Sequence, residues 1–322
     1  MARQGWITVL ATLGAAAVAL ASDDLPAQLT QPTTVVTLTW GAGPREARNS
    51  PESGPGEGAP TSFLVDRQGR LCLLDAANYR ILRDLLGAGQ PPVDLMAAGL
   101  PGPTSYLVDF DVTLDGDFVV LDQVAGTVLR FSPEGKPRGR FGVFRNATEL
   151  AVSPNGRILV RDTYVPAVNV FSNEGKFLSE RRGEHWTVHV DPRGRQYKAQ
   201  LFGVRSGIVS RADVGSARGA TFAAITPVAP GWDLAEVRLA GLDAAGNVYV
   251  KTTEARDEKL KFGRLLRFDP SGKKTAELAI PRVREFFSTL PRFYRVTPTG
   301  KVLTFSTHEQ LGYSILELTF PR

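Results

Sequence analysis

The sequence predicts an all-β fold, because one hairpin pattern occurs six times along its 322 residues. In residues 63–83, FLVDRQGRLCLLDAANYRILR, a short strand is interrupted at Gly69 and followed by an apolar strand that ends at Asp75. Two strands separated by a glycine turn are typical of a β-hairpin. The pattern returns in residues 108–122, 148–162, 186–200, 238–252 and 292–306.

The turn glycines give the size of the repeat. They are separated by 47, 40, 38, 52 and 54 residues, at Gly69, Gly116, Gly156, Gly194, Gly246 and Gly300. A period in this range, with no helical pattern between repeats, is typical of radially arranged β-units. A second hairpin follows in several repeats, at residues 129–136, 169–176 and 266–273. Six four-stranded units therefore predict a six-bladed β-propeller.

The two ends of the repeat region predict how the ring closes. Residues 313–320 supply only a third strand for the last blade, whereas residues 34–40, TVVTLTW, form an apolar strand before the first blade. We therefore expect the N-terminal strand to complete the last blade, so that the propeller spans residues 34–322. This closure removes the exposed edges of an open sheet.

The repeats resemble those of the NHL family. Residues 54–82 and 147–162 share a lead-in of small residues, an apolar-x-apolar-Asp strand, a glycine turn and an aspartate at the end of the strand. Asn78, Arg80 and Ile81 match the step that follows in NHL repeats, and later blades lose it. The resemblance implies an NHL-like six-bladed propeller, a fold that serves many functions.

The N-terminus has the pattern of a secretory signal. Arg3 is followed by an uncharged stretch that ends in Ala19-Leu20-Ala21, a small-x-small cleavage pattern, and the apolar part is short for a membrane span. We expect a signal peptide over residues 1–21, a polar lead-in over residues 22–33, and a secreted or periplasmic mature chain without a transmembrane span. An uncleaved single anchor is the alternative.

Charge and cysteine content exclude two classes of function. The net charge is +5, and arginine is spread through all blades instead of forming a stripe, so we expect no nucleic-acid partner. Cys72 is the only cysteine. The other repeats place an apolar or aromatic residue at its position, so we interpret Cys72 as a small buried hydrophobic residue instead of a nucleophile.

Five polar residues depart from the small side chains that NHL repeats place toward the propeller axis. They lie on the strands before the turn glycines, and they are Asp109, Asp111, Glu149, His189 and Arg295. In one interpretation the carboxylates and His189 bind a cation or a polar ligand, and Arg295 binds an anion or holds a carboxylate. In the other they pair with each other and with water, because charges near a channel must be paired or hydrated.

Metal chemistry would use different subsets of these side chains. Asp109, Asp111 and Glu149 offer the oxygen ligands that calcium prefers, and gluconolactonase-like propellers use acidic and amide side chains at the axis. A zinc site would require His185, His189 and His308 to meet, and no pattern requires that. The sequence contains no nucleophile elbow, phosphate loop or EF-hand loop.

The sequence favours a binding function over catalysis. Tyr79, Tyr164 and Tyr313 lie on the predicted loops opposite the glycine turns, where they would form a recognition rim or pack between blades. We therefore expect a non-catalytic binding or scaffold protein for a protein or polysaccharide partner. The alternative is a calcium-dependent hydrolase or lactonase with its site in the central funnel.

Overall fold

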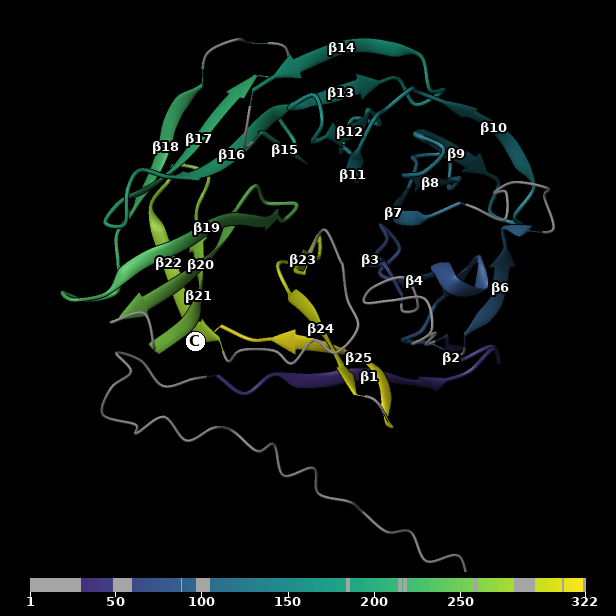
Figure 1. Ribbon diagram of the computed structural model, residues 1–322, viewed down its shortest axis with the longest axis horizontal. Helices are drawn as coiled ribbons and strands as arrows, with labels where there is room; N and C mark the ends of the chain where they lie inside the picture. The colour runs from purple at the N-terminus through teal and green to yellow at the C-terminus, as the bar shows by residue number, and fades with distance from the viewer. Residues whose placement is uncertain are drawn as a thin grey trace, which may run out of the picture.

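The computed structural model describes residues 30–48, 60–87, 89–96, 105–183, 186–213, 216, 219–256, 260–280, 293–308 and 310–320. The described strands form six sheets arranged around a central axis, as Figure 1 shows. Each sheet is one blade, and consecutive innermost strands are neighbours around the ring. The prediction of an all-β, six-bladed propeller with four-stranded blades is confirmed.

Blades 1 to 3 run in chain order from the innermost strand outward. Blade 1 contains β3 (Ser62–Val65), β4 (Leu71–Asp75), the short 3-10 helix η3 (Ala76–Asn78), β5 (Arg80–Arg83) and β6 (Gln90–Asp94). Blade 2 contains β7 (Leu107–Val112), β8 (Phe118–Asp122), β9 (Thr127–Phe131) and β10 (Pro137–Phe141). Blade 3 contains β11 (Ala147–Val152), β12 (Ile158–Asp162), β13 (Ala167–Phe171) and β14 (Phe177–Arg182).

Blades 4 and 5 follow the same order, and blade 6 draws on both ends of the chain. Blade 4 contains β15 (Trp186–Val190), β16 (Arg195–Leu201), β17 (Gly207–Asp213) and β18 (Ala220–Ile225). Blade 5 contains β19 (Asp233–Leu242), β20 (Val248–Arg256), β21 (Leu260–Phe268) and β22 (Lys274–Ile280). Blade 6 contains β23 (Arg295–Val296), β24 (Val302–His308), β25 (Gly312–Leu318), β1 (Thr33–Trp40) and β2 (Glu46–Ala47).

The N-terminal strand closes the ring, as the sequence predicts. Strand β1 pairs antiparallel with β25, with Thr37 opposite Ser314, and Leu38 is 1% exposed. The indole Nε1 of Trp40 also donates to the carbonyl oxygen of His308 at 3.0 Å. The short strand β2 then pairs in parallel with the end of β1, which the sequence pattern does not indicate.

The turn glycines adopt the conformation that the hairpin requires. All six have φ between 79° and 87°, a region in which side-chain-bearing residues are strained. In the first turn the carboxylate of Asp66 accepts hydrogen bonds from the backbone N–H groups of Gln68 and Arg70, both at 2.9 Å. Glycine and a turn-forming polar residue together therefore fix the point at which each inner hairpin reverses.

The hydrophobic core lies between neighbouring blades. One cluster contains Leu64 and Cys72 of blade 1 and Phe110 of blade 2, and another contains Phe63 of blade 1 and Phe305 of blade 6. Cys72 is 2% exposed, in agreement with its interpretation as a small core residue. Burial, helped by the nearby Asp66 carboxylate, raises the pKa of its thiol to about 12.

Several predictions concern residues that lie outside the described ranges. The signal peptide over residues 1–21, most of the lead-in over residues 22–33 and His185 belong to this group. Within the described ranges, none of the helices has both the length and the apolar character needed to cross a bilayer.

Candidate functional site

A charged pair lies at the propeller axis and joins three blades. Nη2 of Arg295, on β23, donates to Oδ1 of Asp109, on β7, at 2.7 Å. The hydroxyl of Ser62, on β3 between them, donates to the same Oδ1 at 2.6 Å, and Arg295 also donates to this hydroxyl oxygen at 2.6 Å. Asp109 is fully buried, so its charge is balanced by these partners instead of by solvent.

Backbone N–H groups of blades 2 and 3 also donate hydrogen bonds to the carboxylate of Asp109. Oδ1 of Asp109 accepts from the N–H of Phe110 at 3.0 Å, and Oδ2 accepts from the N–H of Leu150 at 2.8 Å. Asp111 repeats this link two residues later, because its carboxylate accepts from the N–H groups of Val112 and Val152. The two aspartates therefore fasten β7 to β11 of the next blade.

Glu149 and His189 contact other partners. Nη1 of Arg161, on the neighbouring strand of blade 3, donates to Oε1 of Glu149 at 2.7 Å. His189 is half-buried on β15 of blade 4, and its backbone N–H donates to Oγ1 of Thr187. His308, at the end of β24, accepts backbone N–H groups of the following turn through Nδ1. The described contacts thus unite Asp109 with Arg295, whereas Glu149 pairs within its own blade.

The three predicted calcium ligands accept hydrogen bonds from other groups of the protein. Calcium takes six or more oxygen ligands as a rule. The oxygens of Asp109 and Asp111 accept the hydrogen bonds given above, and Glu149 pairs with Arg161. In the part of the chain that the structure describes, no three histidine, cysteine, aspartate or glutamate side chains are grouped so that they could hold a metal ion.

The alternation of strand direction divides the connections between two sides of the disc. The turns between the first and second strands and between the third and fourth strands lie on one side, which we call the turn face. The loops between the second and third strands and the connections to the next blade lie on the other side, which we call the loop face. The two faces carry different chemistry.

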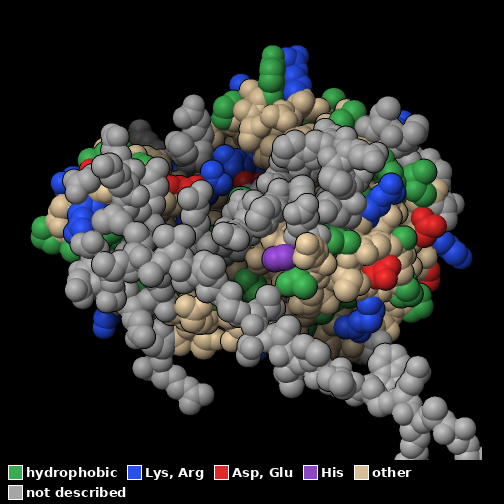
Figure 2. Space-filling model, turned by 60° about the horizontal axis from the view of Figure 1, so that its bottom comes forward, with side chains coloured by type: hydrophobic (Ala, Val, Ile, Leu, Met, Phe, Trp, Pro, Cys, Tyr) green, Lys and Arg blue, Asp and Glu red, His purple; other side chains and the backbone are tan. Residues whose placement is uncertain are grey.

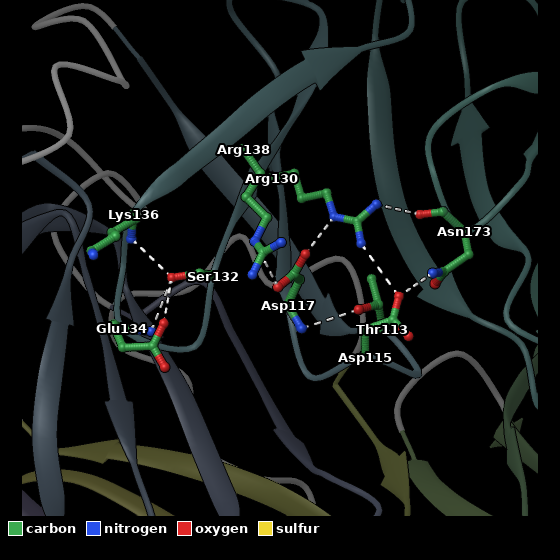
Figure 3. A network of polar contacts seen from close by, with 9 residues as sticks. All are labelled: Thr113, Asp115, Asp117, Arg130, Ser132, Glu134, Lys136, Arg138 and Asn173. Carbon is green, nitrogen blue, oxygen red and sulfur yellow. Dashed lines mark hydrogen bonds and ion pairs between the residues drawn. The ribbon is translucent and has the colours of Figure 1, made fainter.

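The turn face of blades 2 and 3 is closed by a polar network, which Figure 3 shows in detail. The buried carboxylate of Asp117 contacts Nε of Arg130 at 2.7 Å and Nε of Arg138 at 3.2 Å. Arg130 reaches on to the carbonyl oxygen of Asn173, at 2.6 Å, in the next blade. Asp117, Arg130 and Arg138 of this face are therefore engaged in contacts within the protein.

The loop face of blades 2 to 4 instead exposes large hydrophobic side chains. Val143 is 96% exposed and Tyr164 is 62% exposed, and the loops also expose Val124, Val165, Phe202 and Val204. On the turn-face side of the same blades, Leu114 is exposed in a turn, and Phe177 and Leu178 are exposed where β14 begins. Figure 2, which views the side where β1 lies, shows hydrophobic side chains in small patches among charged ones. The apolar exposure is thus concentrated over blades 2 to 4.

The predicted aromatic rim is only partly correct. Tyr164 lies on the loop face and is exposed, as expected. Tyr79 is half-buried, and its hydroxyl donates to the carbonyl oxygen of Ser105. Tyr313 is fully buried on β25, where its ring stacks on Phe305 with centroids 5.4 Å apart. Of the two alternatives, Tyr313 follows packing between blades, because its ring belongs to the hydrophobic cluster that joins blade 6 to Phe63 of blade 1.

A cavity of about 280 Å³ opens between blades 3 and 4. It is lined by Arg161, Asp162, Thr163, Pro166, Ala167, Gly183 and Trp186. The indole of Trp186 lies under the guanidinium of Arg181, with 4.1 Å from Cζ to the ring centroid, and Lys198 Nζ is 5.3 Å from the same ring. Burial lowers the pKa of Arg181. The sequence does not predict this cavity, because its walls come from two blades.

Hydrogen bonds join the loops beside the cavity into one surface. Asn146 of the connection from blade 2 donates to Oγ1 of Thr163 at 2.9 Å, and Gln123 donates to Oδ1 of Asn146 at 3.0 Å. The guanidinium of Arg145 lies over the Tyr164 ring, 5.0 Å from its centroid. Side-chain contacts therefore hold together the loops that carry the exposed valines and Tyr164.

Comparisons with known proteins identify the fold. A calcium-binding protein, regucalcin, from Agrobacterium tumefaciens is 10% identical and has a TM-score of 0.51, with 85% of this chain and 94% of that chain covered. The six-bladed propeller is a fold that this chain shares with it. Identity this low shows the fold alone. No family model matches the sequence, and no curated protein matches it.

Two further solved structures resemble the chain more weakly. A virginiamycin B lyase from Staphylococcus aureus is 11% identical with a TM-score of 0.47, covering 81% of this chain and 95% of that one. A gluconolactonase from Xanthomonas campestris is 10% identical with a TM-score of 0.46, covering 92% and 99%.

Proposed function

We propose that this chain is an exported, non-catalytic propeller that binds a protein or polysaccharide partner through its loop face. The NHL-like repeats and the signal-like N-terminus belong to this proposal. The observation that carries it is the exposure of Val143, Tyr164 and Phe202 on the loop face. Large apolar side chains gathered on one face of a protein mark interaction sites, because exposing them to water is unfavourable.

The contacts at the axis support the same function. Asp109 and Arg295 bind each other and Ser62, and Asp111 binds the backbone of blade 3. Catalytic carboxylates must be able to contact a substrate or a reacting proton. The engagement of these groups with neighbouring blades supports a structural role for the axis, and we propose that recognition lies on the loop face.

The rival function is a calcium-dependent hydrolase or lactonase with its site in the central funnel. It requires Asp109, Asp111 and Glu149 to turn away from their present partners and converge on one ion. The likeness to regucalcin concerns the fold and therefore carries no activity to this chain. No contact among the described residues favours this alternative over a binding function.

Site-specific photo-crosslinking in cells tests the proposal. A photoreactive phenylalanine analogue is placed at Tyr164 or Phe202 on the loop face, and at Leu114 on the turn face as a matched control of similar exposure. We expect a discrete crosslinked partner from the first two positions and none from the third. Equal crosslinking from all three positions, or from Leu114 alone, would contradict the proposal.

A further inference from the structure

Each blade ends in an outermost strand, and these strands lie on the rim of the disc in Figure 1. The edge of an outermost strand presents backbone N–H and C=O groups that are able to pair with a strand of another chain. Proteins prevent this pairing with proline, with charged side chains, or with other groups that cover the edge. An outermost strand without such protection is therefore a place where another chain can add a strand.

The outermost strands of blades 1, 2, 3 and 5 carry such protection. Strand β6 contains two prolines, and Nη2 of Arg83 donates to the carbonyl oxygen of Pro91 at 2.8 Å. Strand β10 contains a proline and two arginines, and β14 contains a glutamate and two arginines. Strand β22 contains a lysine and a glutamate, and its Ala279 carbonyl oxygen accepts from the N–H of Thr30 at 3.0 Å. In blade 6, the outermost strand β2 has two residues, one of which is Glu46.

Strand β18 of blade 4 is the exception. Its sequence, ATFAAI, contains neither a charged residue nor a proline. Among the described residues, no hydrogen bond reaches the backbone of β18 except from the paired strand β17. A bulge interrupts this pairing at Phe222, but bulges also interrupt the pairing of β6, β10, β14 and β22. The lack of charge and proline thus distinguishes the edge of β18 from the other four.

The exposed part of β18 is small and uncharged. Ala220, Thr221 and Ala224 are exposed. The side chain of Phe222 is buried in the cluster between blades 4 and 5, and its carbonyl oxygen lies against Gly272 of blade 5. This contact covers one carbonyl group of the strand. The stretch beyond it, with Ala224 at its centre, is left for a further strand.

We propose that the edge of β18 pairs with β18 of a second copy of this chain, antiparallel and about a two-fold axis at Ala224. The two four-stranded blades then form one continuous sheet. A two-fold axis is the commonest symmetry of protein dimers, and it places the same surface of both copies in contact. The inference does not depend on the partner proposed for the loop face.

The composition of β18 favours a second copy over a strand of another protein. A foreign strand is selected through pockets that take its alternate side chains. The exposed side chains of β18 belong to alanine and threonine, which are too short to form the walls of such pockets. Pairing with itself requires no pocket, but it does require that like charges do not lie opposite each other. Strand β18 meets this condition, whereas self-pairing of β10 would bring arginines of both copies together.

Sedimentation equilibrium of the purified chain tests the inference, and we expect a concentration-dependent equilibrium between monomer and dimer. Ala224→Lys places two like charges at the axis and should weaken the dimer by at least about tenfold. Ala224→Glu should do the same. An equimolar mixture of these two variants should dimerise again, because the charges that meet at the axis are then opposite. The side chain of Ala224 is exposed, so the Tm of each monomer should stay close to that of the wild type.

Two matched controls use other outer strands. Leu178→Lys places the same charge at an exposed position of β14 and should leave the dimer unchanged. Cys72 is the only cysteine and is buried, so an introduced surface thiol reacts alone. Ala224→Cys should form a disulfide between two copies on mild oxidation, because Cα atoms opposite each other in an antiparallel pair are about 4.5–5.5 Å apart. Thr275→Cys, at an exposed position of β22, should form none.

Four results would overturn the inference. A chain that stays monomeric at every concentration would leave the edge of β18 to a strand of another protein. A dimer that both Ala224→Lys and Ala224→Glu leave intact would place the contact elsewhere, and a dimer that Leu178→Lys abolishes would place it on β14. Variants at Ala224 that stay monomeric when mixed, with no disulfide from Ala224→Cys, would reject the two-fold pairing at this residue.

Discussion

Arg295 of blade 6 and Asp109 of blade 2 form an ion pair at 2.7 Å across blade 1, so they join two blades that are not adjacent in the ring. Their side chains are 11% and 1% exposed, which makes the pair nearly dry. A buried pair of this kind is held in place by the cost of leaving either charge without its partner.

Arg295→Leu should therefore destabilise the protein by about 3–5 kcal/mol, because it leaves the Asp109 carboxylate buried beside Ser62 with too little compensation. The double variant Asp109→Leu/Arg295→Leu should recover part of this loss. Urea unfolding of the wild type, both single variants and the double variant gives the coupling free energy. Single-variant losses that simply add would show that the two side chains act independently.

Closure of the ring depends on the close approach of Gly312 to strand β1. Its φ is 109°, and an added Cβ would overlap the carbonyl oxygen of Leu38. Gly194 has a φ of 79° and open space around an added Cβ, so it is a matched control. Gly194→Ala should cost about 1–2 kcal/mol from backbone strain alone.

Gly312→Ala should cost more than Gly194→Ala, because β1 must move away from β25 to admit the methyl group. Limited proteolysis at the N-terminal strand measures this opening directly. Equal stabilities of the two variants, with β1 equally protected, would contradict the role of Gly312 in closure.

Blade 5 contains an ion pair that the sequence does not single out. Arg264 contacts Glu254, and the two side chains are 4% and 0% exposed. Arg264→Ala should cost about 3–5 kcal/mol in the free energy of unfolding. Lys301→Ala, which breaks the exposed pair with Glu317 at 2.9 Å, should cost about 0–1 kcal/mol. Similar losses in the free energy of unfolding would contradict the expectation that burial makes the Arg264 pair contribute more to stability than the Lys301 pair.

The sequence predicts the architecture well because the repeat is a local pattern. Turn glycines and alternating strands locate the blades, and the missing last strand identifies β1 as the closing element. The sequence also indicates which residues of the innermost strands are polar. Asp109 and Arg295 pair with each other, as one of the two interpretations of these residues expects.

Features built from several blades were not predictable in this way. The hydrogen bond from Leu150 to Asp109 and the cavity beside Trp186 depend on how neighbouring blades pack, which no single repeat encodes. Tyr313 shows the same limit, because its burial depends on packing of blade 6 against Phe63 of blade 1. Local sequence patterns thus predict the strands of a blade better than they predict sites formed between blades.

The buried thiol of Cys72 predicts a pH dependence of stability. Its pKa is raised to about 12 in the folded protein, above its ordinary value, so the unfolded chain loses this proton first as pH rises. The stability that the protonated thiol of Cys72 contributes is complete below about pH 9. Above this pH it is lost at up to about 1.4 kcal/mol per pH unit.

The variant Cys72→Val, which places the residue of the second repeat at this position, removes the titrating group. The difference in unfolding free energy between wild type and variant should fall between about pH 8 and about pH 10.5. A difference that stays constant over this range would show that the thiol ionises as easily in the folded protein as in the unfolded chain.

The most direct measurement is elemental analysis of protein purified without chelator, together with the change in Tm on adding calcium, for the wild type and Asp109→Asn. If the axial carboxylates bind their neighbours and recognition lies on the loop face, neither protein contains stoichiometric metal and neither Tm responds to calcium. One calcium ion per chain, with a stabilisation that disappears in Asp109→Asn, would contradict this role and favour a metal-dependent enzyme.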